Sequence, residues 1–360
     1  MPDNILNAKV HTISPVHIGS GRSDLVPSYD FVTEDSKIWV IDHEKMFEEA
    51  EKNGLFDKVG FDAPINKLLK PDQYKQCSKY SLNNLPGVNK IVEQIKTARS
   101  CPYIPGSSLK GAIRTALAYA MVKGGVVKIR KDDMGDNPRT ADKFIEDKLF
   151  GSNANKDVMR ALQVSDTEGV KAIALNSIAL YSIRDRPGEV TLIPKEPRSE
   201  YTFPIEVIPE NTDLSSSIKI DSYLFKEKNS RELGFDNKKD WVRNFAKHCN
   251  DLACDIINIE LQFYDKYRIP RIKAFYERLN KQLNEINPEK QFLLHISWGT
   301  GWASKTIIGN LMDEDLLGEV VGRFNLDKGR GYSVFPKTRR IIERGNIPEM
   351  PLGWIRVDLS

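Results

Sequence analysis

The sequence contains few of the residues that cross-link a protein or bind a metal ion. Its 360 residues include four cysteines, none in a C-x-x-C pair: Cys77, Cys101, Cys249 and Cys254. His248 adjoins two of them, but no fourth ligand lies nearby, so we expect reduced thiols, no metal site and no cofactor. No apolar run approaches the roughly 20 residues that span a bilayer. The N-terminus lacks the features of a signal peptide. These absences predict a cytoplasmic protein with no membrane partner.

The familiar catalytic patterns are also missing. None of the five histidines lies in an H-E-x-x-H or H-x-H pattern, and no G-x-S-x-G occurs. Gly299 to Thr306 nearly matches the phosphate loop of NTPases, but Ser304 replaces its second glycine, and too little chain follows for the remaining parallel sheet. Asp166 follows a predicted strand without a visible partner, so we expect it to be structural. The sequence therefore favours a binding protein over an enzyme.

Acidic residues are absent from one long stretch. The net charge of the whole chain is only +3, yet residues 94–131 contain no Asp or Glu. The same stretch holds Lys96, Arg99, Lys110, Arg114, Lys123, Lys128, Arg130 and Lys131. Such a window is a candidate electrostatic footprint for RNA phosphates, and the alternative is a solvated basic face.

The order of periodic segments predicts an α+β fold. Helical spacing indicates helices over residues 43–52, 107–123, 241–264 and 266–283. Alternating or β-branched segments predict strands over residues 8–14, 161–165, 172–183, 190–193, 200–208 and 292–297, and a hairpin over 29–41. Residues 61–89 carry no clear pattern. We place a domain boundary near residue 195, which gives two predicted domains, 1–195 and 196–360. Two ferredoxin-like units fit this element count, although periodicity does not select them.

A Pro-Gly turn opens the clearest helix. Ser107 or Ser108 can cap it, and free N–H groups at a helix N-terminus suit a phosphate oxygen. Lys110 and Arg114 are four residues apart and share a face, and Gly111 permits close approach of another backbone. The candidate phosphate-binding residues here are Gly106, Ser107, Ser108, Lys110, Gly111 and Arg114. A capped helix with ordinary surface cations is the alternative.

Other glycine-rich segments have the composition of RNA-binding loops. The first spans residues 14–22 and offers His17, Gly19, Ser20, Gly21 and Arg22. The second spans residues 298–306 and offers Gly299, Gly301, Trp302 and Lys305, a combination that suits single strands. Its Trp298 and Trp302 can equally belong to the core or to a protein interface. The basic segment 324–340 adds Lys328 and Arg330, and its alternative is a solvated loop.

Several of these motifs resemble the RAMP superfamily of CRISPR proteins. S-P-V-H-I-G-S-G-R (14–22) resembles its opening strand-loop, and Y-I-P-G-S-S-L-K-G-A-I-R (103–114) resembles its helix-opening motif. F-G-S (150–152) and L-Q-V-S-D (162–166) follow the family's order. The closing L-L-H-I-S-W-G-T-G-W-A-S-K-T and M-P-L-G-W-I-R-V resemble the fifth subunit of type III-A Csm effector complexes. The resemblance is weak over residues 50–95 and 210–290.

The resemblance implies two ferredoxin-like (RRM-type) domains with helical insertions. It implies a non-catalytic subunit that binds CRISPR RNA (crRNA) beside the repeated backbone subunit and caps the Csm filament near the crRNA 3′ end. Its partners would be crRNA, the other Csm subunits and host nucleases that mature this end. Two alternatives remain: an equivalent type III-B subunit, or a metal-independent endoribonuclease that uses His17 with Lys110 or Arg114.

Overall fold

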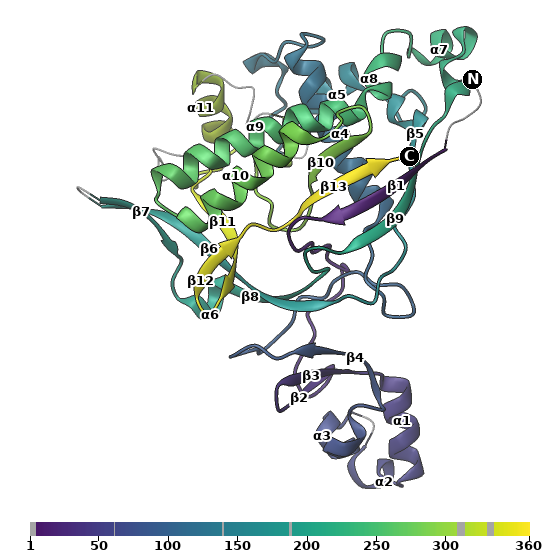
Figure 1. Ribbon diagram of the computed structural model, residues 1–360, viewed down its shortest axis with the longest axis vertical. Helices are drawn as coiled ribbons and strands as arrows, with labels where there is room; N and C mark the ends of the chain where they lie inside the picture. Colours follow the sequence, from purple (N-terminus) through teal and green to yellow (C-terminus); the bar gives the residue numbers. More distant parts are fainter. Residues whose placement is uncertain (1–4, 61, 139, 187–188, 308–313, 330–334) are drawn as a thin grey trace.

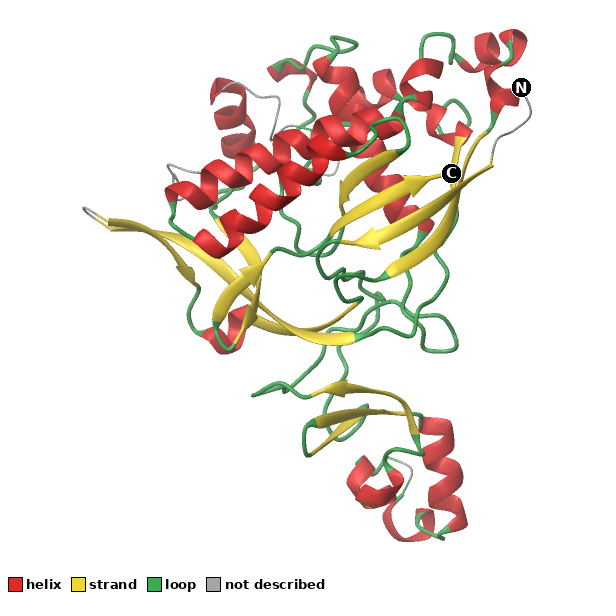
Figure 2. Ribbon diagram, in the orientation of Figure 1, coloured by secondary structure: helices red, strands yellow, loops and turns green. Residues whose placement is uncertain are grey.

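The computed structural model describes residues 5–60, 62–138, 140–186, 189–307, 314–329 and 335–360. Within these residues, helices and strands are mixed, as the predicted α+β class requires. The strands form antiparallel sheets, and the longer helices gather on one side of the sheet that contains the first and last described strands (Figures 1 and 2).

The central sheet has the order β10-β13-β1-β9-β5. Its strands are β1 (Ile5–Thr12), β5 (Leu162–Val164), β9 (Asp213–Ile220), β10 (Gln291–His295) and β13 (Trp354–Leu359). Val10 of β1 pairs with Val357 on one side and with Leu214 on the other. Strands β1 and β5 precede the boundary predicted at residue 195, and the other three follow it. Strands from both predicted domains are therefore hydrogen-bonded into one sheet.

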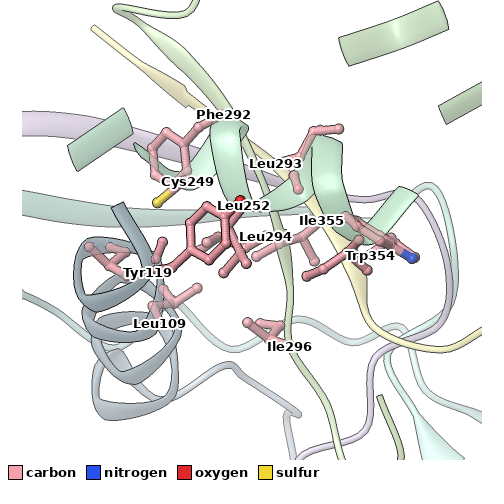
Figure 3. Close-up of a cluster of buried hydrophobic side chains, with 14 of the residues drawn as sticks. Leu109, Tyr119, Cys249, Leu252, Phe292, Leu293, Leu294, Ile296, Trp354 and Ile355 are labelled. Atoms are coloured by element: carbon pink, nitrogen blue, oxygen red, sulfur yellow. The ribbon is translucent and has the colours of Figure 1, made fainter. Parts of the chain in front are cut away.

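Helices α4 (Gly106–Lys123), α9 (Phe245–Lys266) and α10 (Pro270–Glu285) pack with this sheet around the main core. Figure 3 shows Leu109 and Tyr119 of α4 beside Leu252 of α9 and Leu294 of β10, all of them buried. Trp354 of β13 is fully buried in the same cluster. Burying one such side chain contributes about 1.5–3 kcal/mol. The core thus holds segments from both halves of the chain together.

A second sheet has the order β12-β11-β6-β7, with β8 also paired to β6. Its strands are β6 (Ala174–Arg186), β7 (Glu189–Pro194), β8 (Thr202–Val207), β11 (Thr338–Arg344) and β12 (Ile347–Met350). Buried Glu343 of β11 accepts a hydrogen bond from the Tyr181 hydroxyl (2.6 Å) and pairs with Arg198 (2.8 Å). Arg198 lies in the short helix α6 (Arg198–Tyr201), so this network ties the turn before β8 to the sheet.

An insertion between β1 and α4 forms a small unit with its own core. Strands β2 (Phe31–Glu34), β3 (Lys37–Ile41) and β4 (Ser78–Asn83) pair in that order, beside helices α1 (His43–Lys52), α2 (Phe56–Val59) and α3 (Ile65–Leu68). Met46, Ala50, Ile65 and Leu68 are buried there. The unit projects away from the two larger sheets (Figure 1). It includes the stretch 61–89 for which the sequence predicted no structure.

Shorter helices complete the described chain: α5 (Lys143–Leu149), α7 (Glu227–Leu233), α8 (Lys239–Arg243) and α11 (Glu314–Arg323). None of the helices in the described ranges is both long and apolar enough to cross a bilayer. The predicted hairpin at 29–41 and the helix at 43–52 are confirmed. The predicted helix 241–264 is instead two helices that meet at Asn244.

Candidate nucleic-acid interface

Two of the predicted glycine-rich loops lie against each other. The Ser297 hydroxyl donates to the His17 carbonyl (2.8 Å) and accepts from the His17 amide (3.0 Å). The Trp298 amide donates to the same carbonyl (2.9 Å). Loop 14–22 follows β1 and loop 298–306 follows β10, and both strands belong to the central sheet. The sheet therefore joins two segments that are 280 residues apart in the chain.

The His17 ring lies inside the protein and is 1% exposed. Its Nδ1 is 2.6 Å from the Glu206 carbonyl, and its Nε2 has no partner among the described residues. The ring packs edge-on against Trp298, with centroids 6.1 Å apart. Burial lowers the pKa of His17, so the neutral form is favoured. In this position the ring holds the two loops together and cannot reach RNA unless the loops rearrange.

A buried charged cluster lies beside His17, and the sequence reading missed it. Glu206 of β8 is 0% exposed. Its carboxylate accepts from the Tyr80 hydroxyl (2.5 Å), from the Gln94 amide (3.0 Å) and from the Lys96 ammonium. Burial raises the pKa of Glu206, and Lys96 opposes that rise. The cluster joins the insertion to the second sheet. The sequence feature that could have revealed this cluster is Glu206, a glutamate within an otherwise largely apolar strand.

The tip of loop 14–22 is on the surface. Gly19, Gly21 and Arg22 are exposed, and Gly21 has a φ of +76° that a larger residue would rarely adopt. The Arg22 side chain makes no ion pair with any residue in the described ranges. It lines a cleft of about 740 Å³ between this loop and the insertion. Asp24 and Asp30 line the same cleft, so its charges are mixed.

The N-terminus of α4 is capped by a carboxylate from elsewhere in the chain. The Gly106 amide donates to Asp166 Oδ1 (2.7 Å), which is the structural role expected of Asp166. Neither Ser107 nor Ser108 supplies a side-chain cap, so that prediction is wrong. Gly106 itself packs against the end of β5, where a Cβ atom would collide with backbone. One of the N–H groups offered to a phosphate is therefore already occupied, while Ser107 remains exposed.

Lys110 and Arg114 have different surroundings, although they share a face of α4. The Arg114 guanidinium pairs with Asp157 (2.8 Å) and Glu146 (3.2 Å), and it stacks on the Phe150 ring at 3.8 Å. Lys110 forms no ion pair with any described residue. Partial burial lowers the pKa of Lys110, while Asp157 raises it. Of the two cations, only Lys110 is available to an external phosphate without the loss of an internal contact.

Half of the eight cations in the basic window 94–131 are paired with acids from other parts of the chain. Lys123 pairs with Asp255 (3.0 Å) and Lys131 with Glu319 (3.7 Å), in addition to the pairs of Lys96 and Arg114. Within the described ranges, the cations of this window that form no ion pair are Arg99, Lys110, Lys128 and Arg130. The footprint available to phosphates is therefore smaller than the sequence predicted.

Loop 298–306 contributes both tryptophans to packing. Trp298 lies edge-on to Phe203 (5.7 Å) and carries the Arg340 guanidinium over its ring (4.5 Å). Trp302 meets Phe335 edge-on at 5.1 Å. Both tryptophans remain half-buried, and Lys305 is exposed. Gly299 and Gly301 have φ values of +93° and +92°, the left-handed backbone that favours glycine.

Loop 298–306 also reaches α4. Arg114 of α4 and Ile145 of α5 line one side of a groove of about 240 Å³, and Trp302 and Lys305 line another. Three predicted sites, loops 14–22 and 298–306 and helix α4, thus lie in one connected region. The remaining candidate segment, residues 324–340, lies partly outside the described residues. Lys328 is an exposed turn residue with a φ of +57°, and Arg330 lies outside the described residues.

The described side chains of this region suit the binding of an anion better than that of a metal ion. Within the described ranges, no three His, Cys, Asp or Glu side chains are grouped as ligands for a metal ion. The alternative pairing of His17 with Lys110 or Arg114 gains no support, because the His17 ring is buried, and Arg114 is also held by two carboxylates. The arrangement can bind anions through exposed cations and glycine-rich backbone.

Comparisons with known proteins agree over the whole chain. A sequence model of the RAMP superfamily matches residues 9–259. The chain is 26% identical to the Methanocaldococcus jannaschii "CRISPR system Cms protein Csm5", over 98% of this chain and 89% of that protein. It is 28% identical to the protein of the same name from Streptococcus thermophilus, over 44% of this chain and 50% of that protein.

Solved structures share the fold. One chain of a Csm–crRNA–target RNA ternary complex of a type III-A CRISPR-Cas system superposes with a TM-score of 0.70, at 24% identity, covering 99% of this chain and 100% of that one. The crystal structure of T. onnurineus Csm5 gives a TM-score of 0.61, at 22% identity, covering 96% and 99% of the two chains.

Proposed function

Because this chain belongs to the RAMP superfamily, we propose that it is a non-catalytic, crRNA-binding subunit of a type III-A Csm effector complex. In this role it caps the filament near the crRNA 3′ end and supports maturation of that end. The observation that carries the proposal is the similarity to the M. jannaschii Csm5 protein, which extends over 98% of this chain. Its partners are crRNA, the other Csm subunits and host nucleases.

The strand order supports a ferredoxin-like unit within this family. Elements β1, α4, β5, β9, α9 and β10 follow the β-α-β-β-α-β succession of that unit. Strand β13 is inserted between β10 and β1 in the sheet. We assign the first ferredoxin-like unit to these elements. The second sheet, with β6, β7, β8, β11 and β12, then corresponds to the other predicted unit.

Cations that form no ion pair with the described residues support contact with an RNA backbone. Arg22, Lys110 and Lys305 come from three separate segments of one region and form no ion pair with the described residues. A guide-binding subunit must accept many spacer sequences, so phosphate contacts suit it better than base reading. Such binding weakens linearly with the logarithm of salt concentration.

Affinity purification from the native host tests this function. The tagged chain should retain crRNA after a low-salt wash, and the other Csm subunits should copurify. Sequencing of the bound RNA reads its 3′ ends, and a strain that lacks the chain should accumulate longer 3′ ends. The Lys228→Ala variant should retain crRNA like the parent, because Lys228 is an exposed lysine of α7 that forms no ion pair with the described residues and lines none of the clefts at loops 14–22 and 298–306. Absence of crRNA, or identical 3′ ends in both strains, would contradict the proposal.

A nuclease assay separates this function from the enzymatic alternative. Purified protein incubated with repeat RNA in EDTA should leave the RNA intact. Cleavage that disappears in His17→Ala, with a circular dichroism spectrum like that of the parent, would favour a metal-independent endoribonuclease. The spectrum is needed because His17 is buried, and its loss also removes packing.

A further inference from the structure

A cavity of about 430 Å³ lies beneath loop 298–306. The loop forms one wall, and β11 forms another with Arg339 and Arg340. Tyr264 of α9 and Tyr276 of α10 also line it, and both are buried. The volume is within the range of about 300–1,000 Å³ that is typical of small-molecule sites. A group of nucleotide size therefore fits.

The charges at this cavity are unbalanced. Arg339 is satisfied internally, since its Nε lies 2.9 Å from one oxygen of Glu260 and 3.0 Å from the other. The side chains of Lys305 and Arg340 form no ion pair or hydrogen bond with any residue that the structure describes, and Arg340 Nε is buried without a partner there. A partly buried cation without a counter-ion costs free energy, so Arg340, together with the exposed Lys305, favours an anionic ligand.

Arg340 is held rigidly in this position. Its guanidinium lies over the Trp298 ring at 4.5 Å, and its side chain packs so closely on Gly299 that a Cβ there would lie 3.0 Å from Arg340 Cδ. A glycine at position 299 therefore leaves room for the arginine. Lys305 lines the same cavity, where partial burial and the charge of Arg340 lower the pKa of its ammonium group.

Backbone donors and aromatic rings complete the lining. The amides of Gly299, Gly301 and Trp302 donate no hydrogen bond to the described part of the chain. Left-handed glycines in such a loop can turn successive N–H groups toward an anion. The rings of Trp302 and Phe335 border the same space and offer a surface for a base.

We propose that this cavity binds the phosphate of a terminal nucleotide of an RNA strand, held by Lys305, Arg340 and the loop amides. The inference rests on the proposed function, because it names the part of the RNA that this site takes. A terminus fits better than an internal nucleotide, since buried Tyr264 and Tyr276 close the inner side. The cleft at Arg22 is a poorer candidate, because Asp24 and Asp30 line it.

The test measures binding of short RNAs of one sequence that end in a 3′-phosphate, in a 5′-phosphate or in hydroxyls at both ends. One phosphorylated RNA should bind about tenfold tighter than the hydroxyl form, which corresponds to one charge-assisted contact. Lys305→Ala and Arg340→Gln should each bring the ratio of the affinities for the phosphorylated and hydroxyl forms close to one, whatever their effect on the affinity for the hydroxyl form. Lys305→Arg should restore it, and Lys228→Ala should not affect it.

The outcomes separate this inference from the proposed function. RNA binding with no preference for a terminal phosphate overturns the cavity assignment and leaves the RNA-binding function standing. AMP that competes as well as the phosphorylated RNA, and only when Lys305 is present, supports the phosphate site with a free nucleotide as its source. If neither AMP nor any RNA binds, both proposals fail. Lys305→Ala should fold like the parent, because that side chain is exposed. It therefore tests the site even if Arg340→Gln disturbs the packing of Arg340 on Trp298.

Discussion

Arg114→Ala is expected to destabilise the fold by about 2–3 kcal/mol while changing RNA affinity little. Sequence alone would pair Arg114 with Lys110 as phosphate ligands, since both lie on one face of α4. The structure gives Arg114 internal partners and gives Lys110 none among the described residues. The two substitutions should therefore act on different quantities.

The expected loss of folding free energy follows from the contacts of the Arg114 side chain. Its ion pairs with Glu146 and Asp157 are partly exposed, with side-chain exposures of 27% for Arg114, 44% for Glu146 and 25% for Asp157. Each such pair contributes about 0.5 kcal/mol. The cation over the ring of fully buried Phe150 adds about 1–2 kcal/mol. Arg114→Lys should recover part of the loss, because lysine keeps the charge but not the planar stack.

Lys110→Ala is the matched variant. It removes no ion pair, so its effect on the free energy of unfolding should stay within about 0.5 kcal/mol. If Lys110 meets a phosphate, affinity for all RNA sequences should fall, and the slope of log K against log salt should decrease by about 0.7.

Urea unfolding and salt-dependent RNA titrations of the three proteins make the comparison. Arg114→Ala should lower the urea midpoint and keep the salt slope of RNA binding. Lys110→Ala should keep the urea midpoint and reduce the salt slope. A stable Arg114→Ala protein with a reduced salt slope would refute the reasoning. So would a salt slope that Lys110→Ala leaves unchanged.

Three further predictions follow from buried groups. Burial lowers the pKa of His295 to about 3, so the unfolded chain binds more protons below pH 6.5. The resulting stabilisation is complete above that pH and should fall by about 2 kcal/mol by pH 5 in urea titrations, and by less in His295→Gln. Glu206→Ala should cost about 3–5 kcal/mol, because it leaves buried Lys96 without this partner, and a double-mutant cycle with Lys96→Met should show positive coupling; additive effects would contradict the pairing. Gly106→Ala should destabilise by about 1–3 kcal/mol through collision with β5, whereas Gly111→Ala on the same helix, with open space around its Cβ, should stabilise by about 0.5–1 kcal/mol in thermal unfolding.

The local sequence pattern was sufficient to predict the helices and hairpins whose periodicity and turn residues lie within one segment. The hairpin at 29–41 and the helices at 43–52 and 107–123 follow from periodicity and turn residues, and the structure confirms them. Strands β4, β9, β11, β12 and β13 were not predicted, because their burial depends on packing against other segments of the chain.

For the candidate site too, the sequence determined some features and the tertiary structure determined others. Sequence alone identified the glycine-rich loops and the cations, since backbone freedom and charge are properties of residue type and order. Only the tertiary structure decided which cations remain available, because ion-pair partners such as Asp157 for Arg114 and Glu206 for Lys96 come from distant segments. It also decided that Asp166 caps α4 and that His17 lies inside. Charge belongs to a residue, whereas its neutralisation and burial depend on neighbours that folding brings together.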